Sequence, residues 1–118
     1  MAADCPFCRI AAGDMAADEL YRDDAIVAFR DINPQAPTHV LVIPREHIAS
    51  LREADDDNAA LIGRLHVVAA RLARELGIAD DGYRCVINCG NHGGQTVSHL
   101  HMHLIGGKAL GWPPFPRS

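Results

Sequence analysis

The sequence contains no apolar run long enough to form a membrane-spanning helix. Such a helix needs roughly 20 consecutive apolar residues, and every apolar run in these 118 residues is much shorter. The N-terminal segment also lacks a positively charged stretch followed by an apolar one, so we expect no secretory signal peptide. We therefore expect a cytoplasmic protein with no membrane partner.

Positive charge is scarce as well. Lysine and arginine number 11 against 15 aspartate and glutamate residues, which gives a formal net charge of −4. Proteins that bind nucleic acid without sequence specificity are usually basic, so we expect no nucleic-acid partner. Hydrophobic residues make up 48% and charged residues 22% of the chain, a balance typical of a globular protein. We find no internal repeat, and residues 1–118 are expected to form one domain around one core.

Only four cysteines are present, and in the cytoplasm they are expected to be thiols or metal ligands rather than disulfides. Cys5 and Cys8 form a C-x-x-C pair, which supplies half of a tetrahedral zinc site. Cys85 and Cys89 are spaced differently, so any further zinc ligands would be histidines. A redox motif is an alternative, but such motifs normally follow a strand and none is predicted here. Two partly buried thiols without a metal are the simplest alternative.

Turn residues and hydrophobic periodicity predict an α+β fold with an antiparallel sheet of about five strands, one long helix and one short helix. The short helix is predicted over residues 6–12 and ends at Gly13. The long helix is predicted over residues 57–76, with the acidic run 55–57 as its N-cap and Gly77 after its last turn. The strands are predicted over residues 20–22, 25–30, 38–44, 83–88 and 99–105.

The last predicted strand carries three histidines at alternate positions. His99, His101 and His103 should share one face of the strand, and the apolar residues between them should face the core. Three imidazoles in a row contribute little to packing, which favours a functional interpretation over a solvated face or a histidine-rich metal tract. The turn-rich segment 88–94 enters this strand, and its glycines can form a nest of N–H groups for an anion such as phosphate.

A neutral imidazole can act as a nucleophile on phosphorus near pH 7. His101 has a histidine on each side, so it is the best candidate for the attacking group. His103 and His39 could donate to the phosphate or orient the attacking ring. Thr96 and the loop amides could bind phosphoryl oxygens or the leaving group. The carboxylate of Asp31 could recognise the vicinal diol of a nucleoside.

The segment His99-Leu100-His101-Met102-His103-Leu104-Ile105 resembles the histidine triad motif, in which histidines alternate with apolar residues. The surrounding sequence is similar to the Hint branch of that family, the histidine triad nucleotide-binding proteins. The matching segments are residues 5–8, 28–39, 42–48, 93–97 and 112–114, in the family's order and over nearly the whole chain.

The resemblance implies a homodimer with the histidine triad fold that binds purine nucleotides such as AMP and GMP. It implies hydrolysis of the P–N bond of purine nucleoside 5′-phosphoramidates, and of acyl-adenylates, through a nucleotidyl intermediate on His101, with no cofactor needed for the chemistry. The implied catalytic set is His101, His103, His39 and His99. The implied nucleotide-binding set is Asp31, Ile32, Asn88, Gly94, Gln95, Thr96 and Trp112. Thr96 stands where many relatives have serine and keeps the hydroxyl.

Two further features follow from the resemblance. The C-terminal tail 108–118, with Trp112, is expected to pack at the dimer interface or at the rim of the active site. In several bacterial members a C-x-x-C joins two histidines to bind zinc, and here the ligands would be Cys5, Cys8, His47 and His99. Because other members lack these cysteines and remain active, the zinc would be structural.

Three other functions compete with this interpretation. A nucleotide-binding regulatory module would share the fold and have negligible turnover. A metalloenzyme could chelate zinc with His99, His101 and His103, although no nearby carboxylate matches a usual general base. A dinucleoside polyphosphate hydrolase of the fragile histidine triad branch would share the motif, but the tail at Trp112 and the Cys5–Cys8 pair favour the Hint branch.

Overall fold

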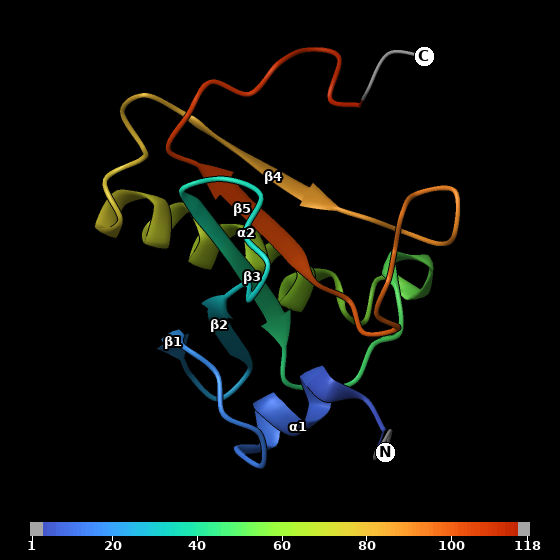
Figure 1. Cartoon of the computed structure of the whole chain (residues 1–118). Helices are drawn as coiled ribbons and strands as arrows, with labels where there is room; N and C mark the ends of the chain where they lie inside the picture. Colours follow the sequence, from blue (N-terminus) through green and yellow to red (C-terminus); the bar gives the residue numbers. More distant parts are fainter. Residues whose placement is uncertain (1–3, 116–118) are drawn as a thin grey trace.

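The computed structural model describes residues 4–115, which form one antiparallel sheet and two α-helices (Figure 1). The strand order is β1-β2-β3-β5-β4, and all four neighbouring pairs are antiparallel. The strands are β1 Glu19–Arg22, β2 Ile26–Arg30, β3 Thr38–Pro44, β4 Tyr83–Ile87 and β5 Met102–Gly106. The helices are α1 Pro6–Ala12 and α2 Ala59–Glu75, with a short 3-10 helix at Leu51–Glu53. The predicted α+β fold is confirmed.

Each face of the sheet packs against one helix. Alternate side chains of β3 belong to two different clusters: Val40 and Val42 face α2, whereas Leu41 and Ile43 face α1. Burial on both faces explains why this strand is apolar almost throughout. Figure 1 shows α2 behind the sheet and α1 near the end of β3 and the start of β5. Neither helix in residues 4–115 has the length and apolar character to cross a membrane.

The short helix begins and ends as its sequence predicts. Pro6 occupies its first turn, and the Cys5 Sγ at the N-cap accepts a hydrogen bond from the Cys8 N–H at 3.3 Å. Gly13 follows the helix with φ 83°, a left-handed conformation that favours glycine. This geometry places both thiols of the C-x-x-C pair on the side of α1 that meets the histidine segment.

The start of the long helix differs from the prediction. The helix begins at Ala59 rather than at residue 57, and Asn58 is its N-cap residue. The Asp55 carboxylate accepts hydrogen bonds from the N–H groups of Asp57 and Asn58. The acidic run therefore forms a local side-chain turn before the helix, a competing arrangement that aspartate favours.

The histidine segment is only partly a strand, which corrects the prediction of a strand over residues 99–105. β5 begins at Met102, and the preceding Leu100 donates its N–H to the Ile48 carbonyl at 2.6 Å instead of joining the sheet ladder. The alternation of faces still holds, because Leu100, Met102 and Leu104 are buried in the cluster under α2. β4 ends at Ile87, one residue before its predicted end.

Candidate active site

A cavity of about 410 Å³ lies between α1, the loop after β2 and the histidine segment. This volume falls in the range of small-molecule sites, about 300–1,000 Å³. Its walls are mostly apolar and are formed chiefly by Phe7, Ile10, Met15, Phe29, Leu41 and Val97. Its polar lining includes Asp31, Thr96, His101 and His103. The sequence reasoning missed the apolar walls, because they come from helix α1 and from strands far from the motif.

His101 is held with a free ring nitrogen. Its Nδ1 lies 2.7 Å from the backbone carbonyl oxygen of His99. A carbonyl oxygen can only accept, so Nδ1 carries a proton, and in the neutral ring Nε2 then keeps the lone pair. The ring is 4% exposed, and the edge-on ring of Phe7 packs against it with centroids 5.1 Å apart. This is the arrangement that a neutral imidazole nucleophile requires.

His103 and His39 form a hydrogen-bonded pair next to His101. The His39 Nε2 and the His103 Nδ1 are 2.8 Å apart, and the ring centroids of His101 and His103 are 5.1 Å apart. Burial, followed by the charges of His101 and His39, lowers the pKa of His103 to about 4. Burial also lowers the pKa of His39, opposed in part by Asp31. Both rings are therefore neutral at pH 7.

Asp31 and Ile32 lie in the loop that leaves β2. The Asp31 carboxylate accepts a hydrogen bond from the Asn33 N–H at 2.8 Å and lies 3.4 Å from the His39 Nε2. Ile32 is fully exposed, although it lines the cavity. A large apolar side chain left in solvent beside an apolar cavity is a candidate ligand contact. Both residues therefore line the same cavity as His101 and His103.

Two amide side chains hold the glycine loop. The Asn88 Nδ2 donates to the Gly93 carbonyl at 2.6 Å. The Gln95 Nε2 donates to the carbonyls of Ala49 and Val97, and its Oε1 accepts from the Gly90 N–H. The side chain of Gln95 is therefore fully used within the protein.

The remaining predicted nucleotide-binding residues differ in their placement. Thr96 lines the cavity. Among the described residues, the cavity lining does not include Asn88, Gly94 or Gln95. Trp112 is also absent from this lining and is 83% exposed, on the tail that follows β5. Of the seven predicted nucleotide-binding residues, only Asp31, Ile32 and Thr96 therefore line this cavity.

Two thiols and two imidazoles converge on one point, and their ligand atoms all lie within 4.8 Å of one another. The residues are Cys5, Cys8, His47 and His99. The Cys5 Sγ lies 3.4 Å from the His99 Nδ1, and the Cys8 Sγ lies 3.1 Å from the His47 Nδ1. The two Nδ1 atoms are 3.2 Å apart.

These distances fit a tetrahedral metal site. Neighbouring ligand atoms around tetrahedral zinc are roughly 3.3–3.8 Å apart. The His99 Nε2 donates to the Pro44 carbonyl at 2.8 Å, which leaves its Nδ1 lone pair directed at the cluster. The four residues can therefore hold a metal ion with little movement.

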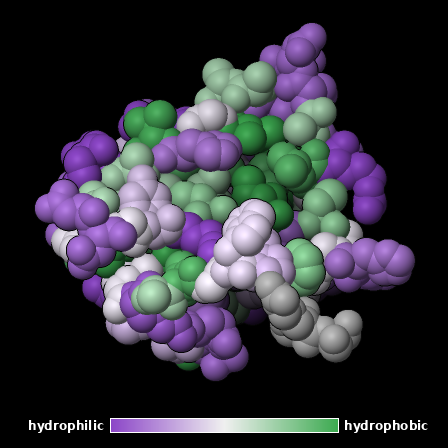
Figure 2. Space-filling model, turned by 90° about the horizontal axis from the view of Figure 1, so that it is seen from above, coloured by the Kyte–Doolittle hydropathy of each residue, from purple (hydrophilic) through white to green (hydrophobic). Residues whose placement is uncertain are grey.

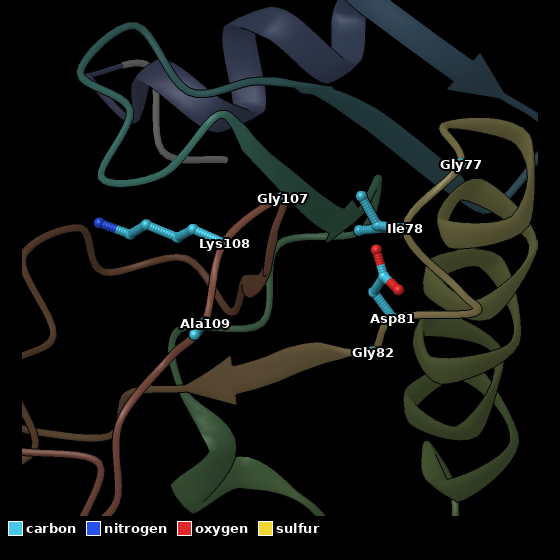
Figure 3. A pocket seen from close by; sticks show the side chains of 7 residues that line it. All are labelled: Gly77, Ile78, Asp81, Gly82, Gly107, Lys108 and Ala109. Carbon is cyan, nitrogen blue, oxygen red and sulfur yellow. The ribbon is translucent and has the colours of Figure 1, made fainter.

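A second hollow of about 320 Å³ lies at the opposite end of β5. It is lined by Gly77, Ile78, Asp81, Gly82, Gly107, Lys108 and Ala109. Figure 3 shows the Lys108 side chain pointing away from Asp81, so the two charged groups do not converge on a ligand position. The histidine cavity is the better candidate for chemistry.

Folding stability is expected to fall as the pH is lowered from about 6.5 to about 4. The pKa of His103 drops from its usual 6.5 to about 4 on folding, so between these values the unfolded chain binds more protons than the folded one. Denaturant unfolding at pH 7.5 and pH 5 would measure the decrease in the free energy of unfolding. We expect a smaller decrease in His103→Asn than in wild type. The matched control His66→Gln alters an exposed ring on α2 and should keep the wild-type loss. An equal loss in His103→Asn would contradict this assignment.

Comparison with known proteins identifies several relatives. The family model described as HIT domain matches residues 12–110. The chain is 49% identical over 114 residues to an uncharacterised HIT-like protein of Synechococcus elongatus, covering 97% of this chain and 99% of the relative. It is 46% identical over 111 residues to the purine nucleoside phosphoramidase of Escherichia coli K12, covering 94% and 93% of the two chains.

Solved structures agree with the sequence matches. A HIT family hydrolase from Legionella pneumophila has a TM-score of 0.92 and 46% identity, covering 94% of this chain and 99% of the other. A histidine triad protein from Clostridium difficile has a TM-score of 0.91 and 42% identity, covering 94% and 96%. The family match, the relatives and the three buried or half-buried histidines of the motif agree, and the chain therefore belongs to the histidine triad (HIT) family and is a hydrolase.

Proposed function

We propose that this protein hydrolyses the P–N bond of purine nucleoside 5′-phosphoramidates, with acyl-adenylates as related substrates. The observation that carries the proposal is the state of His101, whose Nδ1 proton is held by the His99 carbonyl while Nε2 keeps its lone pair beside the cavity. The name of the Escherichia coli relative, purine nucleoside phosphoramidase, supports this substrate class.

The proposed reaction has two displacements at phosphorus. The His101 Nε2 lone pair attacks phosphorus and the P–N bond breaks, while the leaving nitrogen takes a proton from water and departs as the amine. Water then attacks the nucleotidyl-histidine, the P–N bond to His101 breaks, and the proton that this water loses returns to solvent. The nucleoside monophosphate is released and the neutral ring is restored. The His99 carbonyl stabilises the positive charge that the ring gains in the intermediate. His103 and His39 would assist at the phosphoryl oxygens, and Thr96 would contact the phosphate or the leaving group.

The cavity suits a nucleoside. A purine would lie among the apolar walls, where Phe7, Ile10 and Phe29 provide flat or branched surfaces. Asp31 would accept hydrogen bonds from the ribose hydroxyls, and Ile32 would cover the base. The loop that contains Gly94 would offer backbone N–H groups to the phosphate. AMP and GMP are the expected nucleotides.

We further propose that Cys5, Cys8, His47 and His99 hold a structural Zn²⁺. Two thiolates and two imidazoles are a typical donor set for such a site. A bound zinc ion would tie α1 to the histidine segment and so keep the Phe7 wall of the cavity in place. The proposed hydrolysis itself uses only side chains and water, with no cofactor.

We also propose a cytoplasmic homodimer in which the tail 108–118 contacts the partner subunit. Residues 116–118 lie outside the described residues, but Trp112 and Phe115 are large apolar side chains that are mostly exposed. The Arg84 guanidinium donates to the carbonyls of Leu110 and Gly111 and so holds the tail against β4. Figure 2 views the end of the molecule where this tail lies and shows apolar side chains gathered among polar ones. Such a surface is typical of an interface.

The proposed function is tested by mixing the enzyme with excess adenosine 5′-phosphoramidate in EDTA, quenching on the millisecond scale and measuring intact mass. We expect an adenylated species that forms and decays as AMP accumulates. AMP binding without turnover would identify a nucleotide-binding module instead. Turnover of diadenosine polyphosphate alone would identify the dinucleoside polyphosphate hydrolase. Loss of turnover in EDTA alone would contradict chemistry without a catalytic metal.

A further inference from the structure

We propose that the backbone N–H of Gln35 fixes the proton positions on His39 and His103, so that His103 presents an N–H to the reacting phosphate. This inference rests on the proposed function for its catalytic meaning, although the proton positions themselves can be measured without substrate. Gln35 is a positioning residue in this proposal and touches no substrate atom.

The first step concerns His39. The Gln35 N–H donates to the His39 Nδ1 at 3.0 Å. A backbone amide nitrogen can only donate, so the His39 Nδ1 must be a lone pair and the ring proton must lie on Nε2. The ring is only 4% exposed, which leaves little access for water to supply a different partner.

The second step concerns His103, whose proton position depends on that of His39. The His39 Nε2–H points at the His103 Nδ1, 2.8 Å away, so that nitrogen accepts and the proton of His103 lies on its own Nε2. The Asp31 carboxylate, 3.4 Å from the His39 Nε2, favours the same arrangement but makes no hydrogen bond to the ring at that distance. The His103 ring lines the cavity, so its Nε2–H is the group available to a phosphoryl oxygen.

The two rings by themselves do not decide which of them donates the hydrogen bond between His39 and His103. Without the Gln35 N–H, His39 could carry its proton on Nδ1 and accept from the His103 Nδ1–H. His103 would then face the cavity with a lone pair, which repels anionic phosphoryl oxygens. The hydrogen bond from Gln35 selects between two arrangements that have the same number of bonds between the rings.

A backbone carbonyl orients the proposed nucleophile, whereas a backbone N–H orients the proposed donor. The His99 carbonyl places the proton of His101 on Nδ1 and so leaves a lone pair on Nε2. The Gln35 amide acts at the other end of a two-ring relay and gives His103 a donor. A nucleophile and a donor thus lie side by side, with ring centroids 5.1 Å apart, although both are histidines.

Gln35 is rigidly placed for this role. Pro34 and Pro37 restrict the loop on both sides, and the Gln35 side chain donates to the Asn33 carbonyl at 3.0 Å. The same loop contains Asp31 and Ile32, the proposed ribose and base contacts. The proposed nucleoside contacts and the amide that orients the relay therefore belong to one short loop.

The test uses histidine labelled with ¹⁵N in both ring nitrogens and long-range ¹H–¹⁵N spectra, which identify the protonated nitrogen of each ring. In the wild type we expect His39 and His103 to be protonated on Nε2 and His101 on Nδ1. Gln35→Pro removes the N–H and should move proton density on His39 toward Nδ1. The matched control Gln35→Ala retains the N–H and should keep the wild-type tautomers.

Kinetics with adenosine 5′-phosphoramidate separate positioning from binding. We expect Gln35→Pro to lower kcat by about 10- to 100-fold, with a smaller change in KM. We expect Gln35→Ala to lower kcat by a smaller factor. A wild-type spectrum with His103 protonated on Nδ1, or unchanged tautomers in a folded Gln35→Pro variant, would overturn the proposal. If Gln35→Pro does not fold, the wild-type spectrum alone still decides the assignment. Correct tautomers without turnover would overturn only the proposed function.

Discussion

Replacing His101 with alanine is expected to lower kcat for adenosine 5′-phosphoramidate by at least about 10³-fold, because the variant has no nucleophile. The wild-type Nε2 lone pair exists because the His99 carbonyl holds the proton on Nδ1 at 2.7 Å. His103 is not expected to take over this role, since its Nδ1 is used in the relay with His39. Steady-state release of AMP in EDTA, with wild type and variant side by side, measures the effect.

The variant should still bind AMP, because the apolar walls and the Asp31 loop are unchanged. A thermal melt should show a modest loss of stability, since the 4%-exposed ring packs edge-on against Phe7. His66→Ala is the matched control, because His66 is exposed on α2 and its ring hydrogen-bonds the Ile62 carbonyl one turn away on the same helix. Turnover within tenfold of wild type in His101→Ala would rule out the covalent mechanism.

The second large effect is expected from the double substitution Cys5→Ser, Cys8→Ser. It removes both thiolates of the proposed zinc site, and we expect the variant to lose its bound metal. Binding to the folded state alone stabilises a protein by linkage, and the loss should be about 3 kcal/mol or more. For a chain of this size the melting temperature should fall by about 10 °C. Metal content by mass spectrometry and a melting curve provide the two readouts.

The chain offers a matched control for this experiment in Cys85→Ser, Cys89→Ser. These two thiols lie outside the four-residue cluster, so the control should retain metal and a melting temperature close to wild type. The cluster variant should also have a lower kcat, because His99 connects the cluster to His101 through its backbone carbonyl. Equal metal content in both double variants would contradict the assignment of the ligands.

Local chemistry predicted the elements well. The helix over residues 6–12 and its end at Gly13 follow from a proline in the first turn and a glycine that can adopt φ 83°. The apolar run 38–44 became a strand buried on both faces. One error has a local cause, because Asp55 satisfied nearby N–H groups before the helix began. The other has a tertiary cause, because Leu100 bonded to Ile48, a residue distant in the sequence, instead of to a neighbouring strand.

The alternation of histidines with apolar residues was enough to place the imidazoles on one side of their segment. It could not show that α1 covers that side and turns a row of histidines into the wall of a cavity. The packing of Phe7 against both His99 and His101 joins residues more than 90 positions apart. Only burial of apolar surface across the whole sheet decides which segments meet at that distance.

The sequence by itself determined most of the secondary structure, the histidine motif and, through resemblance, the family and the candidate ligands. Tertiary structure decided the protonation pattern of the site. The His99 carbonyl, the Pro44 carbonyl and the Gln35 amide each set the proton of one imidazole. Every residue has a backbone carbonyl and every residue except proline has a backbone N–H, so no sequence pattern marks the groups that orient a ring. Which of them meets a given ring depends on the folded path of the chain, and that path gives each histidine its separate role.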